Sequence, residues 1–592
     1  MILIFGGTTE GRKAAEVLEE AGSPYFYSTK TGEQDLTLQH GQHIDGALDA
    51  EAMTAFIQAH DIRLIVDAAH PFASQLHQTI IAVASEINIP VVRYERIYPP
   101  RDPDITWIDD YSQIPTDIHT LLATTGVQSI SKLKPLEAKG IKVYYRILPR
   151  ESSIKLAHQQ GATDDQLCYY EDGHVIDIET DAILLKESGL SGGFPEKVAA
   201  AREKGTRIIA LTRPQLFTFH SSLFTSVNGP YGLRRMVEHL LPEFYPLHSG
   251  LTTGTCATAA AIAATLRLIK NETPEEVPVI LPDGETIYVP VSYGPDYASC
   301  IKESGDDPDV TNGIEIRATI TPLLSRRGRG GLNNQIEILG GEGVGTITLP
   351  GFDYPPGSPA INKAPREMIR QNLEPFGKPL QVTISVPEGA DIARRTFNPR
   401  LGIEGGISII GVSGIVKPFS EEAFIDSIRK CVTIALASST DRIVINSGGK
   451  SERFVKALYP DLPKQAFVEY GNYIGETLKI IAELSPNSPL KVTLGVMLGK
   501  AVKLAAGHLD THSRKATMDK TFVATLLAES GINLDISNIT LAKELWSMIP
   551  AEQLPVFAKT IIRHCETYCA PLLPDGTLTI YLIDDDGNMY TN

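Results

Sequence analysis

Two side chains in the first 245 residues could move a proton, and each follows a short apolar run. His70 comes after Leu64–Asp67, and Lys186 comes after Ala182–Leu185. Apolar runs of this length are typical of buried strands in a parallel sheet, and ligands bind beyond the carboxyl ends of such strands. We therefore take His70 and Lys186 as candidate acid–base groups. His70 could instead only cap the helix expected to end near Ile87.

A glycine-rich turn follows the first apolar run of the chain, Ile2–Phe5. A strand, a glycine turn and a helix form the front of a dinucleotide-binding unit, although a threonine stands where the middle glycine is usual. The turn indicates either a nucleotide site or an ordinary connection between strand and helix. Its residues are Gly6, Gly7, Thr8, Thr9, Glu10, Gly11 and Arg12.

Hydroxyl groups and a lysine end the next expected strand, at Ser28, Thr29 and Lys30. A dinucleotide-binding domain usually carries its ribose-reading acid near this position, and a lysine suits a 2′-phosphate better than a free 2′-hydroxyl. These residues favour NADPH as the cofactor. A solvated loop would have the same composition.

Basic and hydroxyl side chains near other strand ends are candidate partners for acidic groups of a substrate. In the first half they are Arg93, Arg96, Ser188 and Arg213, and in the second half Lys500, Lys503, His508 and His512. Ordinary surface positions would explain the second group equally well. Two histidines four residues apart could share a helix face as metal ligands, but the preceding Gly507 argues against that arrangement, and we predict no metal site.

Three carboxylates lie within four residues at Asp306, Asp307 and Asp309. Such a cluster could bind a metal ion, act as a base or lie solvated in a turn. Asp306 and Asp307 are therefore candidate catalytic groups of the second half.

Three further segments could bring backbone close to a ligand. Residues 340–345 contain four glycines, and more glycines surround the apolar run Ile407–Ile410. Glycines permit close approach or positive φ angles, although each segment could simply be a turn packed inside its domain. Residues 250–256 place threonines before an alanine-rich helix, whose first turn suits a carboxylate or phosphate unless it is buried.

The expected elements alternate between strands and helices up to Arg213, which indicates two consecutive α/β units with a cleft for a large substrate. Val277–Leu281 and Glu285–Val291 are expected to form a β-hairpin around an Asp-Gly turn. Leu241–Leu247 has two prolines and no helical pattern, so we expect a short linker there. This gives two domains, 1–244 and 245–592.

Composition narrows the functional classes. With 592 residues the chain is too long to fold around a single hydrophobic core, so more than one domain is expected. A net charge of −17 argues against a nucleic-acid partner, and no apolar run approaches the ~20 residues needed to span a membrane. Six scattered cysteines favour a reduced, cytoplasmic enzyme. The sequence leaves a homo-oligomer open.

Blocks in both halves occur in the order found in two families of cobalamin biosynthesis. Gly250-Leu-Thr-Thr-Gly-Thr-Cys-Ala-Thr-Ala-Ala-Ala, Ile301–Val310 and Asn398–Ser420 resemble the cobalt-precorrin-5B C1-methyltransferases. Ile2–Arg12, Asp67–Ala73, Pro90–Arg96, Lys186–Gly189 and Arg213-Pro214 resemble the precorrin-6A reductases.

The resemblance implies a fusion of the two enzymes. Its fold class would be α/β and α+β, with a two-lobed Rossmann-like reductase of parallel sheets and a two-subdomain methyltransferase. The second half would transfer a methyl group from S-adenosylmethionine to ring carbon 1 of cobalt-precorrin-5B, and the first half would then reduce cobalt-precorrin-6A to cobalt-precorrin-6B.

The cofactor sites follow from the same resemblance. The anaerobic reductases are associated with NADH, so the choice between NADH and NADPH stays open. The implied S-adenosylmethionine site comprises Thr252, Thr253, Thr255, Gly341, Glu342, Gly343, Gly345, Gly406 and Gly411. The alternative is an active methyltransferase fused to a catalytically silent nucleotide-binding module.

Overall fold

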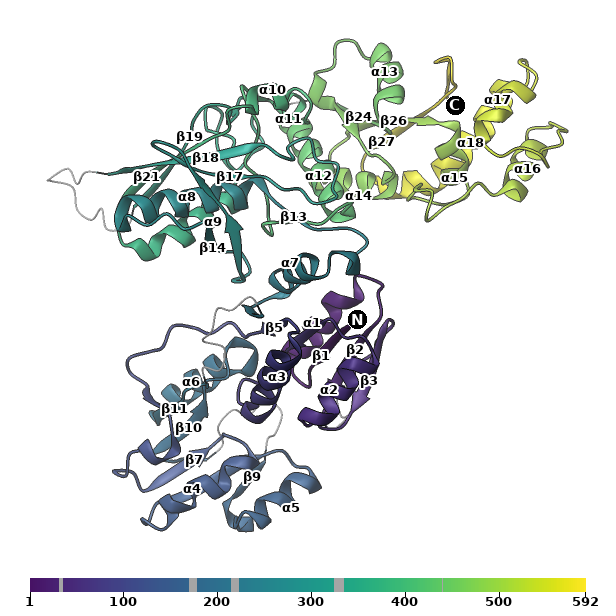
Figure 1. Cartoon of the computed structure of the whole chain (residues 1–592). Coiled ribbons are helices and arrows are strands. Elements are labelled where there is room, and N and C mark those ends of the chain that lie inside the picture. Colours follow the sequence, from purple (N-terminus) through teal and green to yellow (C-terminus); the bar gives the residue numbers. More distant parts are fainter. Residues whose placement is uncertain (31–35, 170–177, 215–222, 324–334, 439) are drawn as a thin grey trace. The chain divides into compact units, whose positions relative to one another are not determined.

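The chain forms two compact units (Figure 1). The computed structural model describes residues 1–30, 36–169, 178–214, 223–323, 335–438 and 440–592. The first unit comprises Met1–Ser249 together with Pro278–Val289, and the second comprises Gly250–Val277 and Pro290–Asn592.

The first unit begins with a six-stranded parallel sheet in the order β12-β5-β4-β1-β2-β3. Its alternate residues pack on opposite faces, since Ile2 and Ile4 of β1 share a core with α1 and α7, and Leu3 and Phe5 share one with α2 and α3. The elements are β1 (Ile2–Phe5), α1 (Thr9–Glu19), β2 (Tyr25–Thr29), β3 (Gly41–Asp45), α2 (Ala50–Ala59), β4 (Leu64–Asp67), α3 (Ser74–Ile87), β5 (Val91–Tyr94), β12 (Phe224–Val227) and α7 (Pro230–Leu240).

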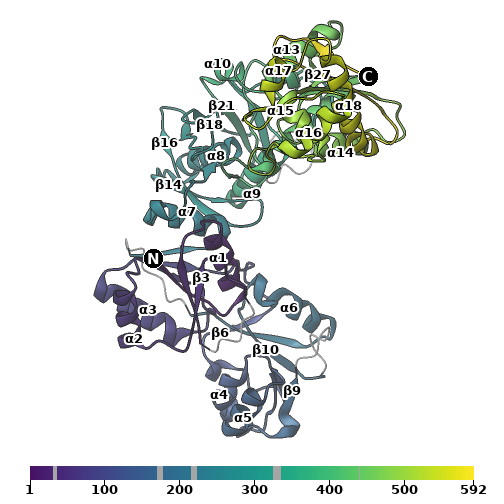
Figure 2. The same cartoon turned by 90° about the vertical axis from the view of Figure 1, so that its right-hand side faces the viewer.

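A second parallel sheet in this unit has the order β6-β11-β10-β7-β8-β9. Helix α6 packs beside β10 and β11, as Figures 1 and 2 show. The elements are β6 (Thr106–Ile108), β7 (Thr120–Ala123), α4 (Ile130–Glu137), β8 (Lys142–Ile147), α5 (Glu151–Gln159), β9 (Leu167–Tyr169), β10 (Ala182–Lys186), α6 (Phe194–Glu203) and β11 (Arg207–Leu211). Two parallel sheets confirm the predicted fold class of the first half.

The prediction of a linker at Leu241–Leu247 is wrong. Pro242–Phe244 form a short 3-10 helix, and Phe244 and Tyr245 are buried in the core that contains α1 and α7. The Tyr245 hydroxyl donates to the Val17 carbonyl oxygen at 2.8 Å. The two prolines therefore start and end a packed segment of the first unit.

The predicted β-hairpin is confirmed as β14 (Glu276–Ile280) and β15 (Thr286–Pro290). Its tip belongs to the first unit, although it follows α8 in the chain. The Thr286 amide donates to Asn228 Oδ1 at 2.7 Å, just before α7. The first unit is therefore completed by residues that come after the start of the second.

The second unit begins with the buried helix α8 (Thr253–Lys270), which packs on β17 and β18 and on α9. The sheet is five-stranded, and only β19 and β21 run parallel to each other. The main elements are β13 (Gly250–Leu251), β16 (Ser292–Tyr293), β17 (Ala298–Ile301), β18 (Glu315–Pro322), β19 (Ile336–Gly340), α9 (Lys363–Leu373), β21 (Leu380–Ser385), α10 (Gly389–Ala393), α11 (Asn398–Leu401) and β23 (Ile415–Val416).

A second subdomain of this unit has the strand order β25-β24-β26-β27-β28, in which only β28 is antiparallel. The last residues of the chain supply two of these strands, β27 and β28. The elements are α12 (Glu421–Ala437), β24 (Arg442–Asn446), α13 (Gly449–Leu458), β25 (Phe467–Glu469), α14 (Ile474–Leu484), β26 (Lys491–Met497), α15 (Leu498–Ala505), α16 (Lys520–Glu529), α17 (Leu545–Met548), α18 (Leu554–Cys569), β27 (Thr577–Ile583) and β28 (Met589–Tyr590).

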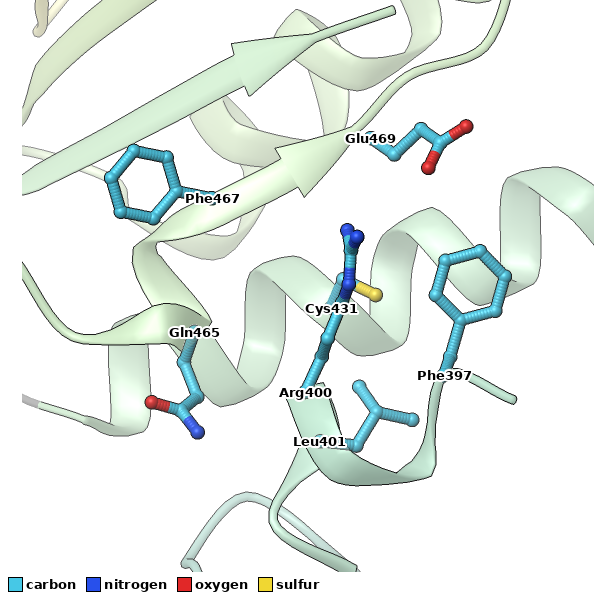
Figure 3. A pocket seen from close by; sticks show the side chains of 7 residues that line it. All are labelled: Phe397, Arg400, Leu401, Cys431, Gln465, Phe467 and Glu469. Carbon is cyan, nitrogen blue, oxygen red and sulfur yellow. The ribbon is translucent and has the colours of Figure 1, made fainter. Parts of the chain in front are cut away.

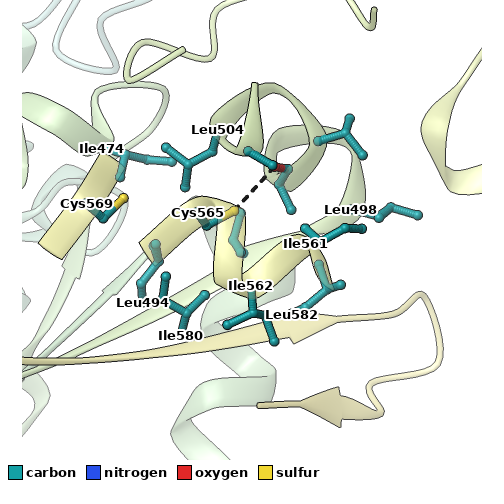
Figure 4. Packing of buried hydrophobic residues seen from close by; sticks show 14 of the residues in the cluster. Ile474, Leu494, Leu498, Leu504, Ile561, Ile562, Cys565, Cys569, Ile580 and Leu582 are labelled. Carbon is teal, nitrogen blue, oxygen red and sulfur yellow. Dashed lines mark hydrogen bonds between the residues drawn. The ribbon is translucent and has the colours of Figure 1, made fainter. Parts of the chain in front are cut away.

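Cys565 and Cys569 lie on the buried face of α18 in the core of this subdomain (Figure 4). The Cys565 thiol donates to the Ala501 carbonyl oxygen at 3.5 Å. Burial raises the pKa of Cys569 to about 12, so this thiol stays protonated at neutral pH. None of the six cysteines forms a disulfide bond, and this pair serves core packing.

Candidate functional sites

The carboxyl ends of β4 and β5 are held together by a buried ionic network. Arg93 Nη1 donates to Asp67 Oδ1 at 3.0 Å and to the Ala69 carbonyl oxygen at 2.9 Å. The His77 ring binds Asp67 Oδ2 at 2.6 Å and the His70 carbonyl oxygen at 3.0 Å. Burial opposes ionisation, but Arg93 and His77 hold the pKa of Asp67 below its ordinary value. Arg93, expected at the substrate, instead supports the loop that carries His70.

Three other predicted site residues bind one another. Arg96 donates from Nε to Glu10 Oε2 at 2.8 Å and from Nη1 to the Ser188 carbonyl oxygen at 2.7 Å. The Ser188 hydroxyl donates to the Gly192 carbonyl oxygen at 3.1 Å. Arg96 and Glu10 are both buried, so their charges offset each other inside the protein. These contacts join the turn after β1 to the segment after β10.

Arg213 belongs to a third ionic group, centred on the buried carboxylate of Glu187. Glu187 accepts from Arg101 at 3.0 and 2.9 Å and from Arg213 Nη1 at 2.8 Å. The Arg213 guanidinium also lies 3.7 Å from the centre of the Tyr98 ring. Arg213 keeps 27% of its side chain exposed, and so remains accessible to a ligand.

Lys186 differs from these arginines because, in the part of the chain that is described, no hydrogen bond or ion pair joins it to an acidic side chain. Its Nζ lies 5.0 Å from the centre of the Phe72 ring. Burial, and to a lesser extent Lys132, lower the pKa of Lys186 to about 8. The amine is therefore mostly protonated at pH 7 and is able to give up a proton.

His70 and Lys186 both lie beside the Phe72 ring, whose centre is 5.9 Å from the centre of the His70 ring and 5.0 Å from Lys186 Nζ. Burial, followed by Arg96, Lys186 and Arg93, lowers the pKa of His70 to about 3. Its Nδ1 accepts from the Phe72 amide at 3.2 Å, which leaves any ring proton on Nε2. The structure thus brings the two predicted acid–base candidates together, with a neutral histidine beside a protonated lysine.

The glycine turn after β1 has an internal side and an open side. An added Cβ would lie 2.1 Å from the Tyr27 hydroxyl at Gly6 and 2.6 Å from it at Gly11, so internal packing requires both glycines. Thr8 caps α1, since its hydroxyl accepts from the Gly11 amide at 2.9 Å. The residue at the middle glycine position is therefore a helix cap.

The open side of the turn consists of Gly7, Thr9 and Arg12, all exposed. Gly7 has a φ of +84°, and an added Cβ there would meet no atom within 4 Å. The Gly7 amide itself donates to the Tyr27 hydroxyl at 3.1 Å, so an anionic group that approaches this open side would meet the start of α1 and the Arg12 guanidinium. These residues fit a nicotinamide nucleotide.

The residues after β2 are less accessible than the sequence indicates. Ser28 and Thr29 are buried, and the Thr29 hydroxyl lies 2.9 Å from His43 Nε2 on β3. Lys30 is exposed. Of this predicted group, only Lys30 is free to reach a 2′-phosphate.

In the second unit, the three threonines at the start of α8 bind a neighbouring loop. Thr253 Oγ1 accepts from the Ile410 amide at 2.8 Å, and Thr255 Oγ1 donates to the Gly414 carbonyl oxygen at 2.6 Å. Thr252 caps the helix, and an added Cβ at Gly411 would lie 2.3 Å from its hydroxyl. The structure brings these predicted residues together, with their hydroxyl groups used internally.

Close packing also explains the glycines of residues 340–345. An added Cβ at Gly343 would lie 1.8 Å from the Val386 carbonyl oxygen, and one at Gly406 would lie 2.1 Å from the Gly343 carbonyl oxygen. Gly341 and Gly345 are enclosed in the same way by Ser385 and Ile403. Glu342 is exposed. Three loops meet at these glycines.

The acidic cluster contains a buried lysine that its sequence pattern does not reveal. Lys302 is 2% exposed, and its Nζ lies 2.7 Å from Asp309 Oδ2. Asp307 Oδ1 accepts from the Phe419 amide at 3.0 Å, and Asp306 is exposed. Across the described ranges, no group of three or more histidines, cysteines or acidic residues is placed to hold a metal ion.

The polar residues after β26 are divided between a helix and a loop. Lys500 lies on α15, where its Nζ donates to the Gly471 carbonyl oxygen, and mainly burial lowers its pKa to about 8. Lys503 donates to the Thr511 carbonyl oxygen at 3.1 Å. His508 and His512 lie in the loop after α15, so they share no helix face.

A small pocket lies beside β25, and none of its residues was predicted as a site (Figure 3). Arg400 points from α11 towards Glu469, and its Nη1 lies 2.9 Å from Glu452 Oε2. The pocket is lined by Phe397, Arg400, Leu401, Cys431, Gln465, Phe467 and Glu469.

None of the described helices is long and apolar enough for a membrane span.

Comparisons with known proteins cover both halves. Residues 1–229 match the family model described as precorrin-6x reductase CbiJ/CobK, residues 242–418 match CbiD, and residues 510–591 match the CbiD C-terminal domain. The cobalt-precorrin-5B C(1)-methyltransferase of Prosthecochloris aestuarii is 40% identical over 352 residues, which cover 57% of this chain and 94% of that protein.

The enzyme of the same name from Priestia megaterium is 36% identical over 365 residues, covering 58% of this chain and 94% of the relative. A solved structure of a CobK precorrin-6A reductase is 17% identical, covers 40% of this chain and 96% of its own, and has a TM-score of 0.33. The chain therefore belongs to the cobalt-precorrin-5B C(1)-methyltransferase family, with an N-terminal region that matches the precorrin-6x reductase family.

Proposed function

We propose that this chain catalyses two consecutive steps of corrin-ring synthesis. The second unit transfers the methyl group of S-adenosylmethionine to ring carbon 1 of cobalt-precorrin-5B, and the first unit reduces the resulting cobalt-precorrin-6A to cobalt-precorrin-6B. The observation that carries the proposal is that one chain matches both enzyme families. In addition, 94% of the length of a cobalt-precorrin-5B C(1)-methyltransferase aligns with this chain.

The nicotinamide nucleotide would be held at the open side of the turn after β1. Gly7 lets the ligand approach closely because it has no side chain, and exposed Arg12 adds positive charge at the start of α1, where a pyrophosphate is favoured. The exposed amine of Lys30 supports NADPH, and the association of anaerobic reductases with NADH supports the alternative. When bound, the nucleotide supplies the hydride.

Lys186 would supply the proton that accompanies the hydride. Reduction of a carbon–carbon double bond forms two bonds to hydrogen, and only one of them comes from the nicotinamide. The lysine ammonium loses this proton to the macrocycle and regains one from solvent. Neutral His70 would accept or donate hydrogen bonds beside it, and Arg213 offers a partly exposed charge to a substrate carboxylate.

Methyl transfer depends chiefly on holding the sulfonium methyl group in line with the acceptor carbon. A catalytically silent first unit is not favoured, because residues 1–229 match the precorrin-6x reductase family model. All six cysteines are present as thiols, which supports a reducing compartment such as the cytoplasm. A homo-oligomer stays open.

The test is the cofactor dependence of the products. Cobalt-precorrin-5B is incubated with the intact chain and S-adenosylmethionine, with NADH or NADPH alone, and with the methyl donor plus each nucleotide, and the product masses are followed. We expect methylation with the donor alone and reduction only when both cofactors are present. Methylated product that neither nucleotide reduces would contradict the assignment of the first unit.

A further inference from the structure

In the parallel sheet of the second subdomain, the order in which the chain adds strands reverses beside β24. The chain goes from β24 to β25 on one side, and then crosses to β26 on the other side of β24. Parallel sheets bind ligands beyond the carboxyl ends of their strands at such a switch point. The residues that follow β24, β25 and β26 are therefore the place to look for a ligand in this unit.

At two positions of this edge, neither backbone conformation nor packing inside the protein requires the glycine that is present. Gly449 begins α13 after β24, and Gly499 lies in the first turn of α15 after β26. Both have ordinary φ angles, and an added Cβ at either one would meet no atom within 4 Å. By contrast, a Cβ at the nearby Gly475 or Gly495 would lie 2.8 or 2.5 Å from a packed side chain.

An acidic side chain ends the neighbouring strand β25. The Glu469 carboxylate lies over the turn after β24, since its Oε1 is 3.1 Å from the Cβ position of Gly448. No hydrogen bond or ion pair links this carboxylate to another group in the described ranges. Burial, which outweighs Arg400 and Lys500, raises the pKa of Glu469. An acid at this strand end, about 20 residues after a glycine turn, accepts hydrogen bonds from ribose hydroxyls in nucleotide-binding folds.

We infer that this edge binds the adenosyl group of the methyl donor, with Glu469 accepting from the ribose diol and the backbone at Gly449 and Gly499 approaching the ligand closely. Lys500 adds a positive charge beside Gly499 for the carboxylate of the donor's amino acid. The inference rests on the proposed methyl transfer and moves the donor away from the loop at 340–345. There the Gly341 and Gly345 amides already donate to Ile384 and Ile407.

An adenosine ribose also occurs in nicotinamide nucleotides, so the test must separate the two sources. Binding of S-adenosylmethionine, its 2′-deoxyadenosyl counterpart and NADH to the intact chain is measured by calorimetry. The variants are Glu469→Gln, which keeps the shape of the side chain, and Gly449→Val, whose side chain the fold can accommodate. Glu342→Gln tests the other candidate site, the glycine loop at 340–345, and Glu552→Gln, at an exposed position of the same unit, is the matched control.

We expect Glu469→Gln and Gly449→Val to weaken donor binding about 10-fold or more, because each removes a charged acceptor or blocks close approach. Loss of the 2′-hydroxyl should weaken binding to the unmodified chain by a similar factor and have no further effect in Glu469→Gln. NADH binding should be unchanged in both variants, and donor affinity should be unchanged in Glu552→Gln.

Three results would overturn the site. These are unchanged donor affinity in both variants, weakened NADH binding in place of weakened donor binding, and a loss of donor affinity confined to Glu342→Gln. An intact chain that binds no S-adenosylmethionine would overturn the proposed methyl transfer itself, and the site with it. Failure of the site alone is thereby distinguished from failure of the function.

Discussion

Glu285 provides a test of how the first unit is completed by the hairpin. It lies at the tip of β14 and β15, within the sequence that matches the CbiD model, yet it packs in the first unit and is 2% exposed. Its Oε2 accepts from the amides of Tyr231 at 2.9 Å and Gly232 at 3.2 Å. Helix α7 starts at a glycine cap without a side-chain acceptor. A residue from beyond α8 therefore caps the last helix of the first unit.

Glu285→Ala leaves both amides without an acceptor. Loss of a helix cap costs about 0.5–2 kcal/mol, and each buried amide left unsatisfied costs about 1–3 kcal/mol. We expect the first unit to lose about 2 kcal/mol of stability against unfolding, and the amides of α7 to exchange hydrogen about 30-fold faster in native-state exchange. Glu276→Ala, at an exposed position of β14, is the control. Unchanged exchange in α7 would refute the reasoning.

The same carboxyl group should make stability depend on pH. Burial, followed by the neighbouring Asp283, raises the pKa of Glu285 to about 8 from an ordinary value of 4.5. A raised carboxyl pKa means that its contribution is complete below pH 4.5 and is lost as the pH rises through 8. Glu285→Gln, which carries no charge, should not show this loss in thermal unfolding measured from pH 5 to 9.

Further predictions concern the first unit. Lys186→Met should slow reduction by about 10²–10⁴-fold and spare methylation, and in the unmodified chain the reduction rate should fall as the pH rises through about 8, as product assays across pH would show. Asp67→Asn, which leaves the buried Arg93 and His77 uncompensated, should cost about 3–5 kcal/mol in thermal unfolding, and a loss below 1 kcal/mol would contradict that role. A first half ending at residue 244 lacks Pro278–Val289 and should show faster exchange in α7 than the intact chain does.

Strands were predicted best where an apolar run is set off by turn residues. The bounds expected for Ile2–Phe5 and Leu64–Asp67 are those observed for β1 and β4. The strand β3 was missed because it is short and largely exposed, and β12 because its pairing with β5 joins segments far apart in the chain. Local patterns carry no information about such distant pairing.

The sequence could identify chemically capable residues but not their partners. Arg93 and Arg96 lie at strand ends as expected, yet whether each faces a ligand or an internal acid depends on Asp67 and Glu10, which only the fold brings near. The glycines at 340–345 were ambiguous for the same reason, since the loops that enclose them are remote in sequence. The pairing of a reductase with a methyltransferase, which rested on ordered motifs, is confirmed by the family matches.

The central claim is that one chain performs two separable steps. Its most direct test is to incubate cobalt-precorrin-5B with S-adenosylmethionine and the nicotinamide nucleotide, and to follow product mass for the intact chain, Lys186→Met and Glu469→Gln. We predict methylated and reduced product from the intact chain, methylated but unreduced product from Lys186→Met, and, at a limiting donor concentration, about 10-fold slower methylation from Glu469→Gln. If Lys186→Met blocked methylation as well, or if the intact chain gave no reduced product, the account would be contradicted.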